Sequence, residues 1–80
     1  MTDEDKQAAR LAIGHRIKEL RTMRRMTQPQ LAAKAHITNA NIANIELGKY
    51  SAGVDILARI ADALGARVDI VEAPYCRLYL

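Results

Sequence analysis

Cationic side chains gather in the middle of this chain, and their distribution gives the first indication of its chemistry. Residues 6–49 carry nine Lys and Arg against two acids, a balance of +7, whereas residues 1–5 carry −3 and residues 50–80 carry −1. The formal net charge of +3 conceals this asymmetry. A basic block of this kind indicates an acidic partner, most simply nucleic acid. The alternative is a solvated, Arg-rich helix surface without a partner.

Three asparagines lie close together within the same block, at Asn39, Asn41 and Asn44. Asparagine is a poor helix former, so three of them in one predicted helix favour a functional role over a structural one. In the major groove of DNA, an asparagine amide can donate to N7 of adenine and accept from its N6 amino group. The alternative for Asn39 is that it only supports the start of the helix beside Thr38.

Catalytic and metal-binding arrangements find no support in the sequence. One cysteine, Cys76, and two histidines, His15 and His36, are spaced neither as a Cys/His nucleophile nor as a metal-ligand cluster. There is no Gly-rich phosphate loop and no paired-carboxylate site. We therefore expect no enzymatic activity, no cofactor and no bound metal. A single cysteine and an acidic start, Thr2-Asp3-Glu4-Asp5, indicate a cytoplasmic protein rather than a secreted one.

The size and composition of the chain limit its architecture. Eighty residues are enough for one small domain, and half of them are hydrophobic. There is no Phe and no Trp, so the core must consist of Leu, Ile, Val, Met and Ala, which favours packed helices over a large cofactor pocket. The apolar runs are too short to span a membrane. The expected fold class is mainly α.

Start and stop signals predict four helices. The first covers about 3–25, with Thr2 as N-cap and Asp5 at the third position. A capping box of Thr27 and Gln30 opens a helix over about 28–34. Thr38 opens a third helix that runs to about 47, where Gly48 stops it, and a fourth spans about 53–64 and ends at Gly65. Gly14 either weakens the first helix or allows a neighbour to pack closely.

Apolar spacing predicts which faces of these helices are buried. In the first helix the expected stripe is Leu11, Ile13, Ile17, Leu20 and Met23. In the fourth helix it is Val54, Leu57, Ile60, Ala61 and Leu64. Residues 67–72 alternate and predict one short strand, which Pro74 ends, and residues 75–80 continue as a second extended piece. A lone strand needs a partner edge.

Two short helices separated by three residues have the geometry of a helix-turn-helix. Counted from Gln28 to Leu47, the positions that must face inward are all apolar: Leu31, Ala35, Ile37, Ile42 and Ile45. The point of closest contact between the two helices requires a small side chain, and it is Ala32.

Four stretches in consistent order carry a family resemblance: IGHRIKELR at 13–21, TQPQLA at 27–32, NIANIELGK at 41–49 and LARIADALG at 57–65. On these residues the chain resembles the Cro and phage-repressor type of helix-turn-helix, also called the XRE type. The resemblance covers about two-thirds of the chain and implies a four- to five-helix bundle that binds DNA, followed by a short C-terminal strand or extended tail. The chain departs from the family at His36, where a Gly is usual because the turn is left-handed.

The resemblance assigns roles to individual residues. The helix at 38–47 is the expected recognition helix, with base contacts from Asn39, Ala40, Asn41 and Asn44. Because this helix has no Arg to read guanine, we expect an A/T-biased site. The expected phosphate contacts are Gln28, Thr38, Lys49, Tyr50, Arg16 and Lys34. The alternatives are that Gln28 only caps its helix and that Tyr50 packs over the fourth helix; Arg24 and Arg25 either contact phosphates or are merely solvated.

The resemblance also implies a partly buried salt bridge between Arg21 and Glu46, which would orient the recognition helix rather than contact DNA. Residues 1–65 would form the helix-turn-helix DNA-binding domain, and residues 66–80 would be a tail for dimerisation or partner docking. The expected function is a transcriptional regulator, most simply a repressor, that binds double-stranded DNA as a homodimer. The alternative is an antitoxin of a toxin–antitoxin pair, whose tail holds a protein partner by strand addition.

Overall fold

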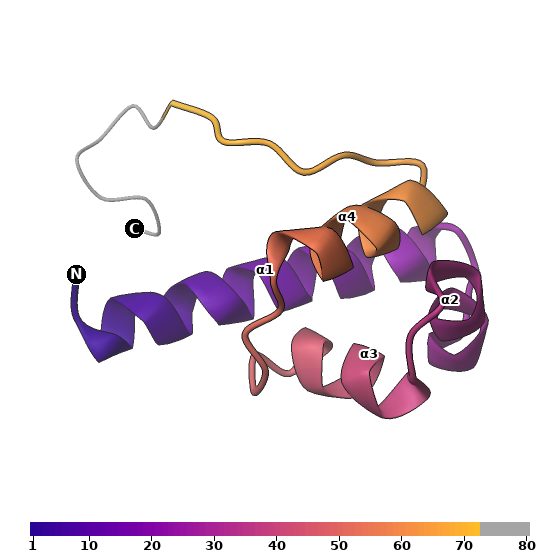
Figure 1. Ribbon diagram of the computed structural model, residues 1–80, viewed down its shortest axis with the longest axis horizontal. Helices are drawn as coiled ribbons and strands as arrows, with labels where there is room; N and C mark the ends of the chain where they lie inside the picture. Colours follow the sequence, from indigo (N-terminus) through magenta and orange to yellow (C-terminus); the bar gives the residue numbers. More distant parts are fainter. Residues whose placement is uncertain (73–80) are drawn as a thin grey trace.

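The computed structural model describes residues 1–72 and contains four helices (Figure 1). They are α1 (Asp3–Met23), α2 (Gln28–Ala35), α3 (Asn39–Glu46) and α4 (Val54–Ala63). The predicted mainly helical fold is confirmed. The expectations that Pro74 ends a strand and that residues 75–80 are extended lie outside the described residues.

Three of the four helices begin at a threonine whose hydroxyl oxygen accepts a backbone N–H three residues later. Thr2 accepts from Asp5 at 3.1 Å, Thr27 from Gln30 at 3.2 Å, and Thr38 from Asn41 at 3.1 Å. The side chain of Gln30 accepts from the N–H of Thr27 in return, which confirms the predicted capping box. Asp5 does the same for Thr2, so α1 also begins with a complete box. These bonds satisfy N–H groups that have no partner inside the helix.

Each of the four helices is followed by a residue with left-handed backbone. These residues are Arg25, His36, Gly48 and Gly65, with φ of 56°, 59°, 73° and 68°. After α3, the N–H of Gly48 donates to the carbonyl of Ile45, and the N–H of Lys49 donates to the carbonyl of Asn44. These two hydrogen bonds define a Schellman motif. The predicted stops at Gly48 and Gly65 are confirmed, and His36 adopts the left-handed conformation expected of the turn.

The core lies where α2 packs against α3 and α4, and where α1 packs against α3. Four of the five predicted inward positions are buried, and Ile37 is half-buried against the core. Ala32, the small residue expected at the closest contact between α2 and α3, is 3% exposed. The remaining buried hydrophobic side chains are Ile17 of α1, Ile60 and Ala63 of α4, and Leu64 directly after α4.

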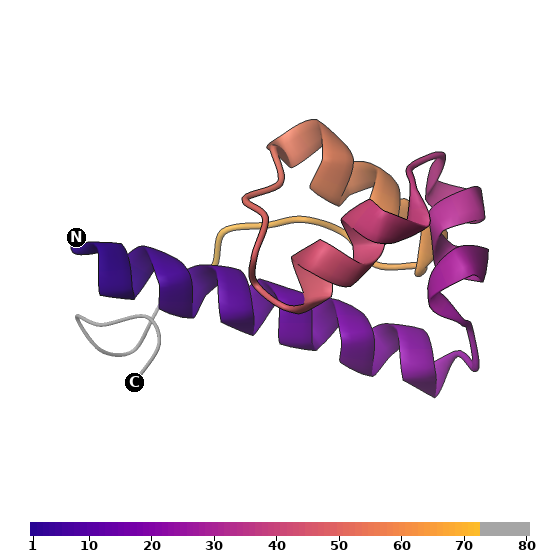
Figure 2. The ribbon, with the colours of Figure 1, turned by 90° about the horizontal axis from the view of Figure 1, so that it is seen from below.

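Two of the predicted buried stripes are wrong at their ends. Val54 is 69% exposed and Met23 is 68% exposed. Val54 is the first residue of α4 and Met23 the last of α1, so each lies beyond the edge of the small core. Leu11 and Ile13 are 46% and 40% exposed, although Leu11 lies against Gly48 and Ile13 lines the groove between α1 and α4. The N-terminal part of α1 extends beyond the other helices (Figure 2). Periodicity predicts a face of a helix but not how far the neighbouring helices extend along it.

The strand predicted over residues 67–72 is absent, because within residues 1–72 the chain offers it no partner edge. The segment instead runs as an extended tail along α4 and α1, on the side of the molecule away from α3 (Figures 1 and 2). Its first residues, 66–69, line an apolar groove together with Ile17 and Leu20 of α1 and Leu57 and Ile60 of α4.

Candidate nucleic-acid interface

One face of helix α3 is packed in the core, and the opposite face is accessible to solvent. Ile42 and Ile45 are 0% and 3% exposed and anchor the helix in the core. On α1, Gly14 lies against the backbone of the last turn of α3, where an added Cβ would be 2.7 Å from the carbonyl oxygen of Glu46. The two helices can approach this closely only because position 14 has no side chain.

The side chains expected to contact bases lie along the open face of α3. Asn39, Ala40 and Asn44 are exposed, and Asn41 is half-buried. The hydroxyl of Thr38 accepts the N–H of Asn41, so Thr38 serves as the helix N-cap. None of the three asparagine side chains makes a hydrogen bond within residues 1–72, so their amides remain available for base edges.

An ion pair between Arg21 of α1 and Glu46 of α3 connects the helix-turn-helix to the first helix. Nε of Arg21 donates to Oε2 of Glu46 at 2.7 Å, and Nη2 donates to Oε1 at 3.1 Å. Nη1 donates to the carbonyl of Met26 at 2.8 Å. Both residues are buried, and the bidentate geometry with the extra carbonyl leaves neither charge without partners.

Gln28 belongs to the same network. Its Nε2 donates to Oε1 of Glu46 at 3.0 Å, which links the first turn of α2 to the last turn of α3. An amide nitrogen carries two hydrogens, so one N–H remains for a phosphate oxygen while the other holds Glu46. No local sequence pattern predicts this contact, because it joins residues eighteen positions apart.

The loop after α3 contains Lys49 and Tyr50, and the first helix braces it. Nε2 of Gln7 donates to the carbonyl of Gly48 at 3.3 Å, and the side chain of Leu11 lies against the α-carbon of Gly48. Arg10 donates to Oε1 of Gln7 at 2.6 Å. Gln7 and Arg10 are not among the residues predicted from the sequence, although the helical spacing of Gln7, Leu11 and Gly14 places Gln7 on the face of α1 that packs on this loop.

Lys49 is exposed, and Tyr50, 43% exposed, lies beside Ala52 and Leu57 at a small cavity. Tyr50 thus lines the same cavity as Leu57 of α4, while part of its side chain remains accessible. Both side chains follow directly after Gly48, so the direction of the chain at that glycine determines where they lie relative to α3.

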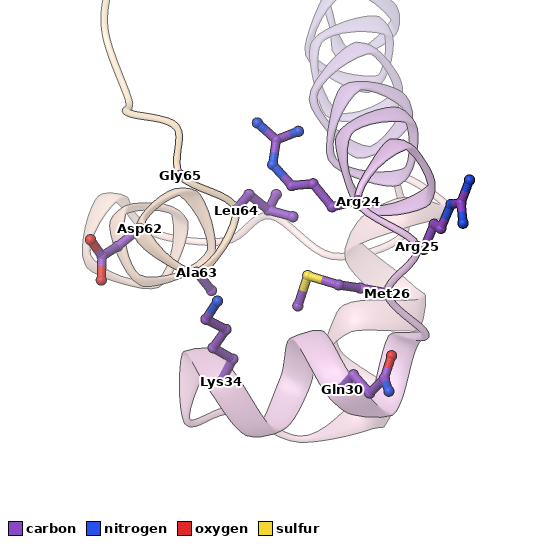
Figure 3. A pocket seen from close by; sticks show the side chains of 9 residues that line it. All are labelled: Arg24, Arg25, Met26, Gln30, Lys34, Asp62, Ala63, Leu64 and Gly65. Carbon is purple, nitrogen blue, oxygen red and sulfur yellow. The ribbon is translucent and has the colours of Figure 1, made fainter.

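Arg16 and Lys34 line cavities to which no residue of α3 contributes. Arg16 forms an exposed ion pair with Glu19 one turn along α1. Lys34 lines an open cavity of about 670 Å³ between α1, α2 and α4, in which its ammonium group points toward Ala63 at the end of α4 (Figure 3). Arg24 lies on the opposite side of this cavity, and Arg25 points away from it (Figure 3). No residue of α3 lines it.

A family model described as helix-turn-helix matches residues 17–71. The chain belongs to the helix-turn-helix family. This is the Cro and phage-repressor (XRE) type that the sequence resembled, a family of DNA-binding transcriptional regulators rather than enzymes. No solved structure gives a significant match to the chain.

Two curated relatives align with most of this helix-turn-helix protein. It is 38% identical over 61 residues to the immunity repressor protein of Bacillus phage phi105, an alignment that covers 76% of this chain and 42% of the relative. It is 43% identical over 56 residues to a Mycobacterium tuberculosis protein named "Putative antitoxin HigA2", covering 69% of this chain and 55% of the relative. The chain thus spans about half the length of these relatives. Among residues 1–72, no helix is long and apolar enough to cross a membrane.

Proposed function

We propose that this protein is a sequence-specific regulator of transcription that binds double-stranded DNA as a homodimer in the cytoplasm and acts as a repressor. One observation supports this proposal above the others. The open face of α3 carries three asparagines whose amides make no hydrogen bond within residues 1–72, while the opposite face is anchored by Ile42, Ile45 and the buried Glu46. A helix fixed in this way can hold polar side chains at defined positions in a major groove.

The proposal divides the work between two groups of side chains. Asn39, Ala40, Asn41 and Asn44 would contact base edges, with Ala40 against a thymine methyl group. Gln28, Thr38, Lys49 and Tyr50 surround α3 and would contact phosphates, which fixes the register of the helix without reading sequence. Arg16 and Lys34 line cavities away from α3 and would add to the positive potential or contact phosphates outside the central site. On this proposal residues 1–65 are the DNA-binding unit.

Selection of bound sequences from a random duplex pool, at near-physiological salt and with the purified chain alone, tests this function. We expect enrichment of an A/T-biased palindrome whose half-sites are about one helical turn apart. The affinity for the selected site should fall with salt concentration, with a log–log slope of roughly −0.9 per phosphate neutralised. A salt-independent affinity would contradict DNA binding through the basic block.

Substitution of the asparagines separates base reading from general DNA binding. Asn41→Ala and Asn44→Ala should relax the sequence preference and leave the affinity for random DNA nearly unchanged. Lys49→Ala is the matched contrast, because loss of a phosphate contact weakens binding to all sequences and lowers the salt slope by about one. Equal loss of specific and nonspecific affinity in the asparagine variants would refute their role as base readers.

The second candidate is an antitoxin-like protein that uses the same fold to bind DNA and a protein partner. The mycobacterial relative motivates it, together with the exposed tail. The selection experiment discriminates between the two candidates. If the chain alone enriches no sequence but does so after co-purification with a protein held by residues 66–80, the antitoxin-like function replaces the homodimeric regulator.

A further inference from the structure

The open cavity between α1, α2 and α4 has the composition of a ligand site. Its volume is about 670 Å³, which is within the range of cavities that bind small molecules. Its lining combines apolar side chains with cationic ones, and no residue of α3 contributes to it. A molecule bound in this cavity therefore leaves the open face of α3 accessible.

Apolar side chains form the floor of the cavity. Ala63 and Leu64, at the end of α4, are buried, and Met26 is half-buried against the core. In Figure 3, the side chains of Met26 and Leu64 extend into the space between Arg24 and Lys34. The floor thus separates two cationic groups by a stretch of apolar surface.

The two cationic groups lie on opposite sides of this floor. Arg24 comes from the end of α1 and Lys34 from α2, whereas Arg25 and Asp62 point away from the cavity (Figure 3). Within residues 1–72, neither Arg24 nor Lys34 forms an ion pair. The positive charge at the cavity is therefore not neutralised by any side chain in the part of the chain that the structure describes.

The helix ends at the cavity do not account for both cations. The C-termini of α1 and α4 each carry about half a negative charge, so together they offset one cation of the pair and leave the other. The carbonyl of Ala61 already accepts the backbone N–H of Ala66 at 2.8 Å. Nη1 of Arg24 donates to the carbonyl of Leu20 at 3.3 Å, which leaves the other N–H groups of the guanidinium unused. Lys34 makes no hydrogen bond within residues 1–72.

We propose that this cavity binds a small organic dianion in which an apolar body separates two acidic groups. One acidic group contacts the guanidinium of Arg24, which suits a carboxylate through two parallel hydrogen bonds, and the other contacts the ammonium of Lys34. The apolar body covers Met26 and Leu64. An α,ω-dicarboxylate has this composition. The inference does not depend on DNA binding, because no residue of α3 lines the cavity.

The arrangement favours two charges joined by an apolar body over simpler ligands. A monocarboxylate can pair with one cation and leaves the other to solvent. A neutral molecule of equal length gains only the apolar contact, and inorganic phosphate has no body to cover the floor. Each comparison isolates one part of the site, so the preference among these ligands is a test of the geometry.

Chemical-shift titration of the full chain at pH 7, without DNA, tests the site. The ligands are the dicarboxylates from succinate to azelate, each compared with the monocarboxylate and the diol of equal length. We expect the affinity to be highest at one chain length, and that dicarboxylate should bind about tenfold more tightly than its monocarboxylate. Amide shifts should be confined to residues 24–34 and 61–65. Equal affinity for the two kinds of acid, or shifts at all basic residues alike, would overturn the proposal.

Substitution of the two cations tests their roles, and both are exposed, so their replacement leaves the core intact. Arg24→Gln and Lys34→Gln should each weaken binding of the preferred dicarboxylate roughly tenfold and abolish its advantage over the monocarboxylate. Arg24→Lys keeps the charge and should retain most of that advantage.

Lys18→Gln and Arg59→Gln are the matched controls. Each removes one positive charge at an exposed position of α1 or α4 that does not line the cavity. Because solvent and salt screen charges at that range, the dicarboxylate affinity should change by less than about twofold. If the controls weaken binding as much as the cavity variants do, the ligand responds only to the overall charge of the protein, and the site is rejected.

Discussion

A Cβ atom on Gly14 would lie 2.7 Å from the carbonyl oxygen of Glu46, and closer still to the carbonyl oxygen of Ile45. The backbone of α1 therefore touches the backbone of α3 without a side chain between them. Both atoms belong to main chain inside packed helices, so neither can move away cheaply. This contact determines the distance at which α3 lies from the first helix.

Gly14→Ala should destabilise the protein. Alanine is favoured over glycine in a helix by about 1 kcal/mol, but overpacking against backbone costs about 3 kcal/mol, so the steric cost dominates. Urea denaturation would measure the free energy of unfolding. Gly53→Ser is the matched control, because no atom lies within 4 Å of its Cβ and a serine at that N-cap adds a hydrogen bond. An unchanged Gly14→Ala variant would contradict the proposed contact.

The left-handed backbone at His36 is strained, and a glycine at this position would relieve the strain. His36→Gly should raise the free energy of unfolding by about 0.5–1 kcal/mol, because glycine adopts a φ of 59° without a Cβ clash. Gly65→Ala is the reciprocal test, since its φ is 68° and no atom lies near its Cβ. It should cost about 1 kcal/mol from backbone strain alone. Thermal unfolding of both variants and of the wild type measures the two changes in stability. If both variants are stabilised, or both destabilised, backbone strain at φ above zero does not explain them.

Removing one partner of the Arg21–Glu46 ion pair should lower the free energy of unfolding more than removing both partners. Arg21→Met or Glu46→Leu alone should cost about 3–5 kcal/mol, because each leaves a buried charge without its partner. The double variant should be far less destabilised than the sum of the two, since it leaves no charge behind. A double-mutant cycle by chemical denaturation measures the coupling. Additive losses would mean that the pair is not a stabilising unit.

Thr38 has two roles that a single substitution can separate. Thr38→Asp keeps an N-cap oxygen for the N–H of Asn41, so the free energy of unfolding should stay within about 0.5 kcal/mol of wild type. The added negative charge would repel a phosphate, and DNA affinity should fall roughly tenfold. Thr2→Asp makes the same change at the N-cap of α1 and should leave DNA affinity unchanged. Unaltered DNA binding by Thr38→Asp would exclude a phosphate near this residue.

Gln7 should hold the loop after α3 in place through its hydrogen bond to Gly48. Gln7→Ala removes the hydrogen bond to the carbonyl of Gly48 and should cost about 1 kcal/mol of stability. Amide hydrogen exchange in residues 49–51 should become faster, because the loop loses its brace. Lys6→Ala, at the exposed neighbouring position, is the control and should leave that exchange rate unchanged. If exchange is the same in both variants, Gln7 does not hold the loop.

The sequence by itself determined the helix-turn-helix and the ends of its helices. The signals at Thr27, Gln30, Thr38 and Gly48 act through hydrogen bonds between residues three to five positions apart, so they can be read without knowing the fold. The inward positions Leu31, Ala35, Ile42 and Ile45 follow from the same local periodicity. The base and phosphate contacts assigned to α3 and its surroundings remain predictions.

Only the tertiary structure decided what joins these elements to the rest of the molecule. The contacts of Gln28 with Glu46 and of Gln7 with Gly48 link residues 18 and 41 positions apart, and no local pattern encodes their geometry. The sequence left open whether Gly14 weakens α1 or allows close packing, and the position of α3 decided for close packing. The exposure of Val54 and Met23 likewise depended on where the neighbouring helices end. The tail at 66–72 shows the same limit, because a strand is specified by its partner edge as much as by its own alternation.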